Sequence, residues 1–154
     1  MITPRDIVDV ELDAVRVLFD AQKEIFPMCV FIHGTEHTMM PLMFSNDYEK
    51  DLASDVIRRI VKEQKPDGVI YMSEAWALVL KTDKPPKELP RPSKHKDRIE
   101  VVIVTIEFKT GEKFSCQARI LREQNKVTLS EFDVSEDQTL MGRFTDFFPP
   151  ERTH

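Results

Sequence analysis

The sequence contains little cysteine, little glycine and no long apolar run. Its two cysteines, Cys29 and Cys116, lie far apart and fit no Cys-x-x-Cys spacing, so we predict two free, buried thiols instead of a disulfide framework. No stretch approaches the roughly 18 apolar residues that a membrane-spanning helix needs. The first residues also lack the basic and then apolar pattern of a secretory signal. We therefore expect a cytoplasmic protein that has no membrane as a partner.

Motifs of catalysis and cofactor binding are missing as well. With only 4 glycines, the chain has no Gly-rich phosphate loop, no dinucleotide-binding fingerprint and no Gly-x-Ser-x-Gly elbow. No quartet of cysteines and histidines has the spacing of a zinc site. We accordingly predict no cofactor. The formal net charge of -5 argues against nucleic acid as the main partner, because binding to phosphates needs a basic surface that displaces counterions.

The composition that remains is that of a folded protein. The chain has 154 residues, of which 41% are hydrophobic and 32% charged, and this is the length of one ordinary domain. We expect a single α+β domain over residues 1–148 and a frayed C-terminus over residues 149–154.

The periodicity of apolar residues predicts the element order α-β-β-α-β-β-β-β, followed by a C-terminal tail. Two main helices are expected, one from about residue 4 to residue 25 and one that starts at Ser45, Asn46 or Asp47 and ends before Pro66. We assign Leu52, Val56 and Ile60, with the neighbouring Ile57 and Val61, to the apolar stripe of the second helix. The strands should form an antiparallel or mixed sheet of about five to six strands with the helices on one face. They are predicted at residues 28–32, 39–44, 69–80, 99–108, 113–122 and 127–132.

Beyond the last strand, Ser135 and Gln138 have the spacing of a capping box. The phenylalanines that follow, at positions 144, 147 and 148, suggest a short helix or a segment that docks on the domain. A contact with a partner or a second copy is the alternative for these aromatic side chains.

Charge is unevenly distributed along the chain. Between Lys81 and Lys96 there are six basic and two acidic residues, so this segment carries about +4 and the rest of the chain about -9. Four prolines, some with Pro-x-x-Pro spacing, predict a long loop of polyproline character. Such a loop is either a solvated connection or a site for a partner or an anion such as phosphate.

The segment His33-x-x-Glu36-His37 matches the His-x-x-Glu-His pattern of one class of zinc peptidases. That chemistry needs the motif on a helix, where residues four apart project from one face. Here the motif follows a predicted strand and contains Gly34, which is typical of a hairpin turn. We interpret these residues as turn residues and keep a metal site as the weaker alternative.

Ser73 and Glu74 interrupt the otherwise apolar strand predicted at residues 69–80. Glu74 and Trp76 would project from the same face, where a carboxylate must find a partner. Arg98 and Glu100 open the next strand, and Arg119 lies in the one after it. If these strands are neighbours, Glu74 can pair with Arg98 or Arg119, either as an ion pair that fixes strand register or as a binding or catalytic cluster.

Two segments together resemble a known group of proteins. They are Tyr71-Met72-Ser73-Glu74-Ala75-Trp76 and the stretch from Pro92 to Glu100, which leads through a Gly turn to Ala118-Arg119-Ile120-Leu121-Arg122. The chain is similar here to small, uncharacterised prokaryotic and phage-associated proteins with a Ser-Glu-Ala-Trp strand and a later Arg-x-Glu motif. The resemblance covers residues 68–122, and it implies no activity.

The sequence leaves three hypotheses about function. The first is a binding or regulatory module that uses the polar cluster and the basic loop to contact an unknown protein or a small anionic ligand. The second is a small hydrolase or transferase with Glu74 as base, Arg98 or Arg119 as anion clamp, and His33 or His37 as possible metal ligands. The third is a subunit of a homo-oligomer assembled through a sheet edge or the phenylalanines of the tail.

Overall fold

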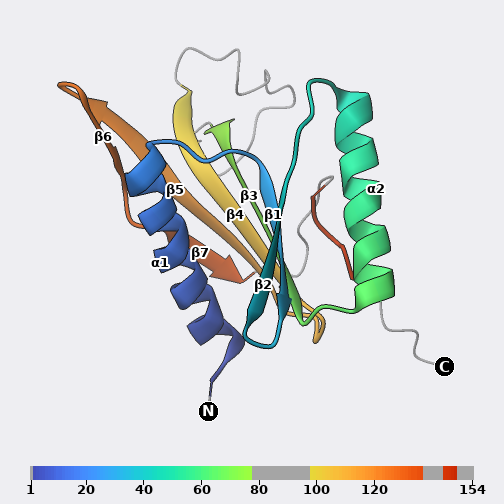
Figure 1. The fold of residues 1–154 in the computed structure, drawn as a ribbon. Helices are drawn as coiled ribbons and strands as arrows, with labels where there is room; N and C mark the ends of the chain where they lie inside the picture. The colour runs from blue at the N-terminus through green and yellow to red at the C-terminus, as the bar shows by residue number, and fades with distance from the viewer. Residues whose placement is uncertain (1, 78–97, 137–143, 149–154) are drawn as a thin grey trace, which may run out of the picture.

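The computed structural model describes residues 2–77, 98–136 and 144–148, which form an antiparallel seven-stranded sheet with one helix on each face (Figure 1). The predicted α+β class is therefore confirmed, with one strand more than expected. The helices are α1 (Pro4–Gln22) and α2 (Asp47–Gln64). The strands are β1 (Met28–His33), β2 (Glu36–Pro41), β3 (Gly68–Ala77), β4 (Ile99–Phe108), β5 (Lys113–Glu123), β6 (Lys126–Leu129) and β7 (Asp133–Glu136).

The strands are ordered β2-β1-β3-β4-β5-β6, and β7 pairs with the first half of β5. Every pairing is antiparallel, and the hairpin of β4 and β5 turns at Gly111, whose φ of 106° suits a residue without a side chain. As predicted, β3 is a central strand that is buried on both faces over its first half. The basic segment from Lys81 to Lys96 lies outside the described residues.

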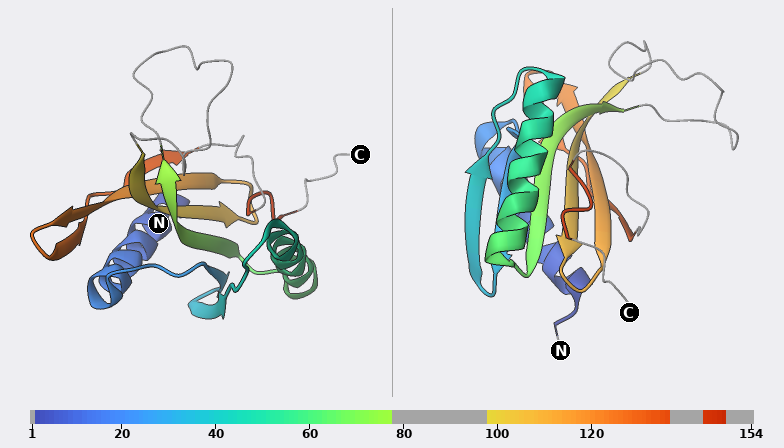
Figure 2. Two further views of the ribbon diagram at one scale, coloured as in Figure 1. Left: turned by 90° about the horizontal axis from the view of Figure 1, so that it is seen from above. Right: turned by 90° about the vertical axis from the view of Figure 1, so that its right-hand side faces the viewer.

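The two helices cover opposite faces of the sheet (Figure 2), which corrects the expectation that both lie on one face. In β1, Val30 and Ile32 belong to the core on the α1 side, whereas Cys29 and Phe31 belong to the core on the α2 side. Alternate residues of a strand point to opposite faces, so a strand that is apolar at successive positions needs a cover on each side. The sheet consequently separates two apolar cores.

Helix α1 begins as predicted, because Thr3 and Asp6 form a reciprocal capping box. It ends at Gln22, three residues earlier than expected, where Lys23 adopts the left-handed conformation with a φ of 62°. Its core face consists of Val8, Leu12, Val15 and Phe19, all of which are buried.

Helix α2 begins after Asn46, whose side chain accepts a hydrogen bond from the backbone N–H of Glu49 at 2.8 Å. Its predicted apolar stripe is confirmed in part. Ile57 and Val61 are buried and Ile60 packs against the same core, but Leu52 and Val56 remain 46% and 47% exposed. Neither described helix has the length and apolarity that a membrane span requires.

The chain after β5 departs most from the prediction. The strand expected at residues 127–132 is the shorter β6, and β7 was not foreseen. Ser135 lies in β7 opposite Ser115, so the expected helix cap at this residue is wrong, and Gln138 lies outside the described residues. Residues 144–148 are not helical but pack on the α2 face, where the ring of Phe144 stacks on Tyr71 with centroids 4.3 Å apart.

Candidate functional site

The candidate site lies at the end of the sheet where β3 stops and β4 starts. Trp76 of β3 stands directly opposite Glu100 of β4, and Glu74 stands opposite Val102. These side chains share the sheet face of Met72, which is the face that α1 covers. In Figure 1 they belong to the upper ends of the green and yellow strands, close to where the chain leaves α1 for β1. Four of the five residues predicted from sequence are neighbours in this region.

An arginine and an indole form one exposed part of the site. The guanidinium carbon of Arg98 lies 4.2 Å from the centroid of the Trp76 ring, which is the geometry of a cation–π contact. Trp76 is 40% exposed, an unusual position for the one tryptophan of the chain. A partly exposed indole with a guanidinium over its ring combines an apolar surface with a positive charge.

Glu100 pairs with Arg122 of β5, a residue that the sequence prediction left without a role. The Nε of Arg122 donates to Glu100 at 2.6 Å, and its second nitrogen donates to the other carboxylate oxygen at 3.4 Å. The hydrogen bond with Glu100 raises the pKa of the Arg122 guanidinium. The signal was present in the alternation of β5, because Arg122 is four residues from the buried Ala118 and thus on its face.

Glu74 is held by the backbone at the end of α1. One of its carboxylate oxygens accepts a hydrogen bond from the N–H of Ile25 at 3.4 Å. Partial desolvation raises the pKa of the Glu74 carboxyl above its ordinary value, against the opposing effects of the Ile25 N–H and of Arg122. The nearby carboxylates of Glu24 and Glu100 raise this pKa further. Glu74 is thus the titratable group of the site whose charged form is disfavoured.

Arg119 does not join this cluster. The register places it opposite Val101, and both side chains therefore point to the α2 face, away from Glu74. The sequence analysis assumed neighbouring strands correctly but did not fix which positions share a face. A shift of one residue along a strand exchanges its two faces, so the choice between Arg119 and Arg122 depends on register.

The three residues of the His-x-x-Glu-His pattern are divided between the two faces of the sheet. His33 pairs with Glu36 across the β1–β2 hairpin, while His37 pairs with Ile32 and so points the other way. The Nε2 of His37 lies 2.5 Å from a carboxylate oxygen of Glu11 on α1. Among the described residues there is no group of three or more side chains that could hold a metal ion. The geometry gives no support to the metal alternative.

A buried carboxylate on the α2 face escaped the sequence analysis. Glu107 of β4 is 1% exposed and accepts hydrogen bonds from the backbone N–H groups of Asp146 at 2.6 Å and Phe147 at 3.3 Å. Burial raises the pKa of its carboxyl, against the effect of these two donors. Since Glu107 anchors the segment 144–148, its role in the described residues is to hold that segment on the sheet.

Both cysteines are free and buried, as predicted. Burial raises the pKa of the Cys29 and Cys116 thiols to about 12, so neither is a thiolate near neutral pH.

The site near Trp76 contains paired charges, an indole and one carboxylate with a raised pKa, and these are groups suited to recognition.

Comparison with known proteins agrees with the resemblance to phage-associated proteins. None of the curated proteins and none of the solved structures matches the chain. A family model described as "Bacteriophage lambda protein ea47" matches residues 3–147, which include both helices and all seven described strands. Since this match spans most of the 154 residues, the chain belongs to the family of the bacteriophage lambda protein ea47.

Proposed function

We propose that the protein is a binding module that docks an acidic segment of a protein partner at the sheet end formed by Trp76, Arg98, Glu100 and Arg122. The observation that carries the proposal is the Arg98 guanidinium lying 4.2 Å over a tryptophan ring that remains 40% exposed. Tryptophan and arginine are the residue types most enriched among the residues that dominate binding energy in protein interfaces. A second copy of the chain is the competing occupant.

The charges of this region favour an acidic partner. Arg98 brings a positive charge next to the indole, and the nearby carboxylate of Glu100 is paired with Arg122 at 2.6 Å. The segment from Lys81 to Lys96 is joined to this end of the sheet at both of its ends and carries about +4 in a chain whose net charge is -5. Opposite charges on a partner would speed association and fix its orientation. We place this interaction in the cytoplasm, the compartment that the sequence predicts.

The rival hypothesis of a hydrolase or transferase has less support. Two of the residues named for it lie away from Glu74, because Arg119 points to the α2 face and His37 pairs with Glu11. Glu74 has the raised pKa of a potential general base. However, a general base needs a substrate pose within hydrogen-bond reach, and no second reactive group among the described residues accompanies it there.

The single tryptophan makes the site directly observable. We would titrate the protein with a short peptide of Glu, Asp and Leu, and with the same peptide carrying Gln and Asn in place of the acids, while recording Trp76 emission. The acidic peptide should change the emission saturably and lose affinity as salt is added, since exposed charges are screened. The variant Arg98→Glu should bind about tenfold more weakly.

The matched control is Arg59→Glu, which makes the same charge change at an exposed position of α2. If both variants weaken binding equally, the interaction is a general charge effect and the proposal fails. Competition by inorganic phosphate would indicate a small-anion site instead of a protein-binding one. Binding of the neutral peptide with equal affinity would also contradict the proposal, because the charge of the partner would then be irrelevant.

A further inference from the structure

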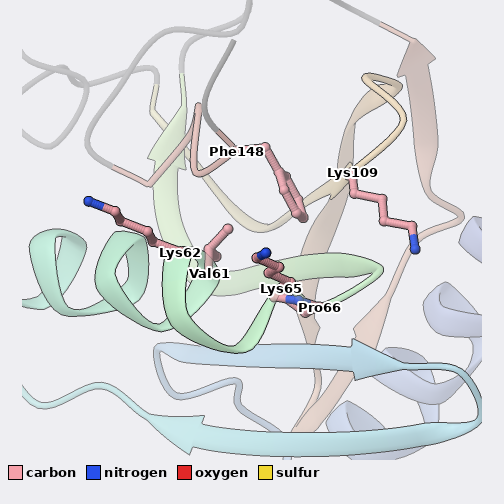
Figure 3. A pocket seen from close by; sticks show the side chains of 6 residues that line it. All are labelled: Val61, Lys62, Lys65, Pro66, Lys109 and Phe148. Atoms are coloured by element: carbon pink, nitrogen blue, oxygen red, sulfur yellow. The ribbon is translucent and has the colours of Figure 1, made fainter. Parts of the chain in front are cut away.

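A second concave region lies on the α2 face, on the opposite side of the sheet from Trp76. It is a pocket of about 390 Å³ at the end of α2. Figure 3 shows the ring of Phe148 between the end of α2 and the turn that follows β4. The pocket is lined by Val61, Lys62, Lys65, Pro66, Lys109 and Phe148.

The walls of this pocket are apolar and its rim is cationic. Val61 and Pro66 are buried, and the half-buried Phe148 supplies an aromatic surface. The three lysines reach the rim from separate places, namely the last turn of α2, its C-cap and the β4–β5 turn. Pockets that bind small molecules commonly combine apolar walls with a few polar groups in volumes of about 300–1,000 Å³.

Only one of the three positive charges is neutralised nearby. The Nζ of Lys109 lies 2.6 Å from a carboxylate oxygen of Asp67, and Asp67 also accepts the N–H of Gly34 at 2.6 Å. No described residue forms an ion pair with Lys62 or Lys65. Lys62 and Lys65 therefore add two positive charges to the lining of an apolar pocket in a chain whose net charge is -5.

We propose that this pocket binds a small organic anion with an aromatic body, such as an aromatic carboxylate or sulfonate. The ring of the ligand would lie against Val61, Pro66 and Phe148, where its apolar surface leaves water. Its anionic group would lie between the ammonium groups of Lys62 and Lys65, which can donate charge-assisted hydrogen bonds. The volume suits a ligand with two or three fused or linked rings, whereas a folded partner would not enter it.

A pair of fluorescent dyes tests both halves of the proposal. Anilinonaphthalene sulfonate has the aromatic body and the negative charge, and the neutral phenylnaphthylamine has the same rings without the charge. With the full chain under native conditions, the sulfonate should bind with a stoichiometry of one and weaken as salt is added. The neutral dye should bind about tenfold more weakly, because it cannot use the lysines.

The test variant is Lys62→Glu, and the matched control is Lys126→Glu on the exposed strand β6. Lys62→Glu should weaken the sulfonate about tenfold but leave the neutral dye unchanged. Thermal unfolding of each variant shows whether it is folded, and Lys65→Gln provides a second substitution if Lys62→Glu is not. Trp76→Phe should have no effect on the sulfonate, so failure here is separable from failure of the proposed protein-binding site.

Three results would overturn the inference. Equal loss of affinity in Lys62→Glu and Lys126→Glu would mean that the dye senses only overall charge. Weakening by Met39→Glu instead of Lys62→Glu would place the dye in the other apolar groove, between α1 and the β1–β2 hairpin, which Met39 lines with His37 and Glu11. Retention of full affinity in both lysine variants would exclude the cationic rim from binding.

Discussion

Replacing Glu107 by Ala should release the segment 144–148 from the sheet and destabilise the protein. The Glu107 carboxylate is 1% exposed and accepts the N–H groups of Asp146 and Phe147. Each buried donor left without an acceptor costs about 1–3 kcal/mol. The N–H of Asp146 is the more accessible of the two and can donate to water instead, and the variant no longer buries a carboxylate. Both effects reduce the cost, so we expect the free energy of unfolding to fall by about 2–4 kcal/mol.

Thermal unfolding followed by circular dichroism measures this loss. For a chain of this length each kcal/mol shifts the midpoint by about 2–4 °C, so Glu107→Ala should unfold roughly 5–15 °C below the parent. Limited proteolysis should also cut near residues 144–148 sooner in the variant. Glu136→Ala, at an exposed position of β7, is the matched control and should change the midpoint little. A decrease of less than about 1 kcal/mol in Glu107→Ala would refute the anchoring role.

The pH dependence gives an independent check on Glu107. Burial raises the pKa of this carboxyl above its ordinary value of 4.5, so the folded state holds the proton more firmly than the unfolded state does. Stability contributed by this group is therefore greatest at acidic pH and declines as the pH rises from the ordinary pKa through the raised one. Since Glu107→Gln does not titrate, the stability of the parent relative to this variant should fall over that interval. A difference that rises with pH would contradict the assignment.

Two further predictions concern side chains away from the proposed sites. Cys29 and Cys116, with pKa values raised to about 12, should resist a thiol reagent at pH 8 in the folded protein and react promptly in denaturant, and rapid labelling of the native chain would contradict their burial. Zinc should give no large thermal stabilisation that depends on His37, because His33 and His37 point to opposite faces. If zinc raised the unfolding midpoint of the parent and of the control Lys126→Glu but not that of His37→Ala, this prediction would be wrong.

Much of the fold followed from local patterns. The start of α1 near Pro4, an N-cap of α2 among residues 45–47 and the strands β4 and β5 depend on residues close together in sequence, and these predictions were confirmed. By contrast, β7 was missed because its four residues have a pattern too short to distinguish from a loop. It is a strand because the first half of β5 has a free edge that it can pair with.

The candidate site was predictable only in part, because the alignment of neighbouring strands is not a local property of the sequence. Alternation along a strand placed Glu74 and Trp76 together. The partner of Glu100 depends on how β4 and β5 are aligned, and that alignment put Arg119 on the other face. The sequence did not show that Glu107 is buried. Its carboxylate is satisfied by the backbone N–H groups of Asp146 and Phe147, which are about 40 residues away in the chain.

The sequence alone determined the types and approximate limits of the helices and strands, the chemistry available to them and the uneven charge along the chain. Those properties arise from periodicity, capping and composition, which act over a few residues. The tertiary structure decided that the two helices lie on opposite faces, that an indole and a guanidinium stack at the end of the sheet, and that lysines from separate elements surround one apolar pocket. These arrangements depend on strand register and on contacts between distant residues, and no local pattern specifies them.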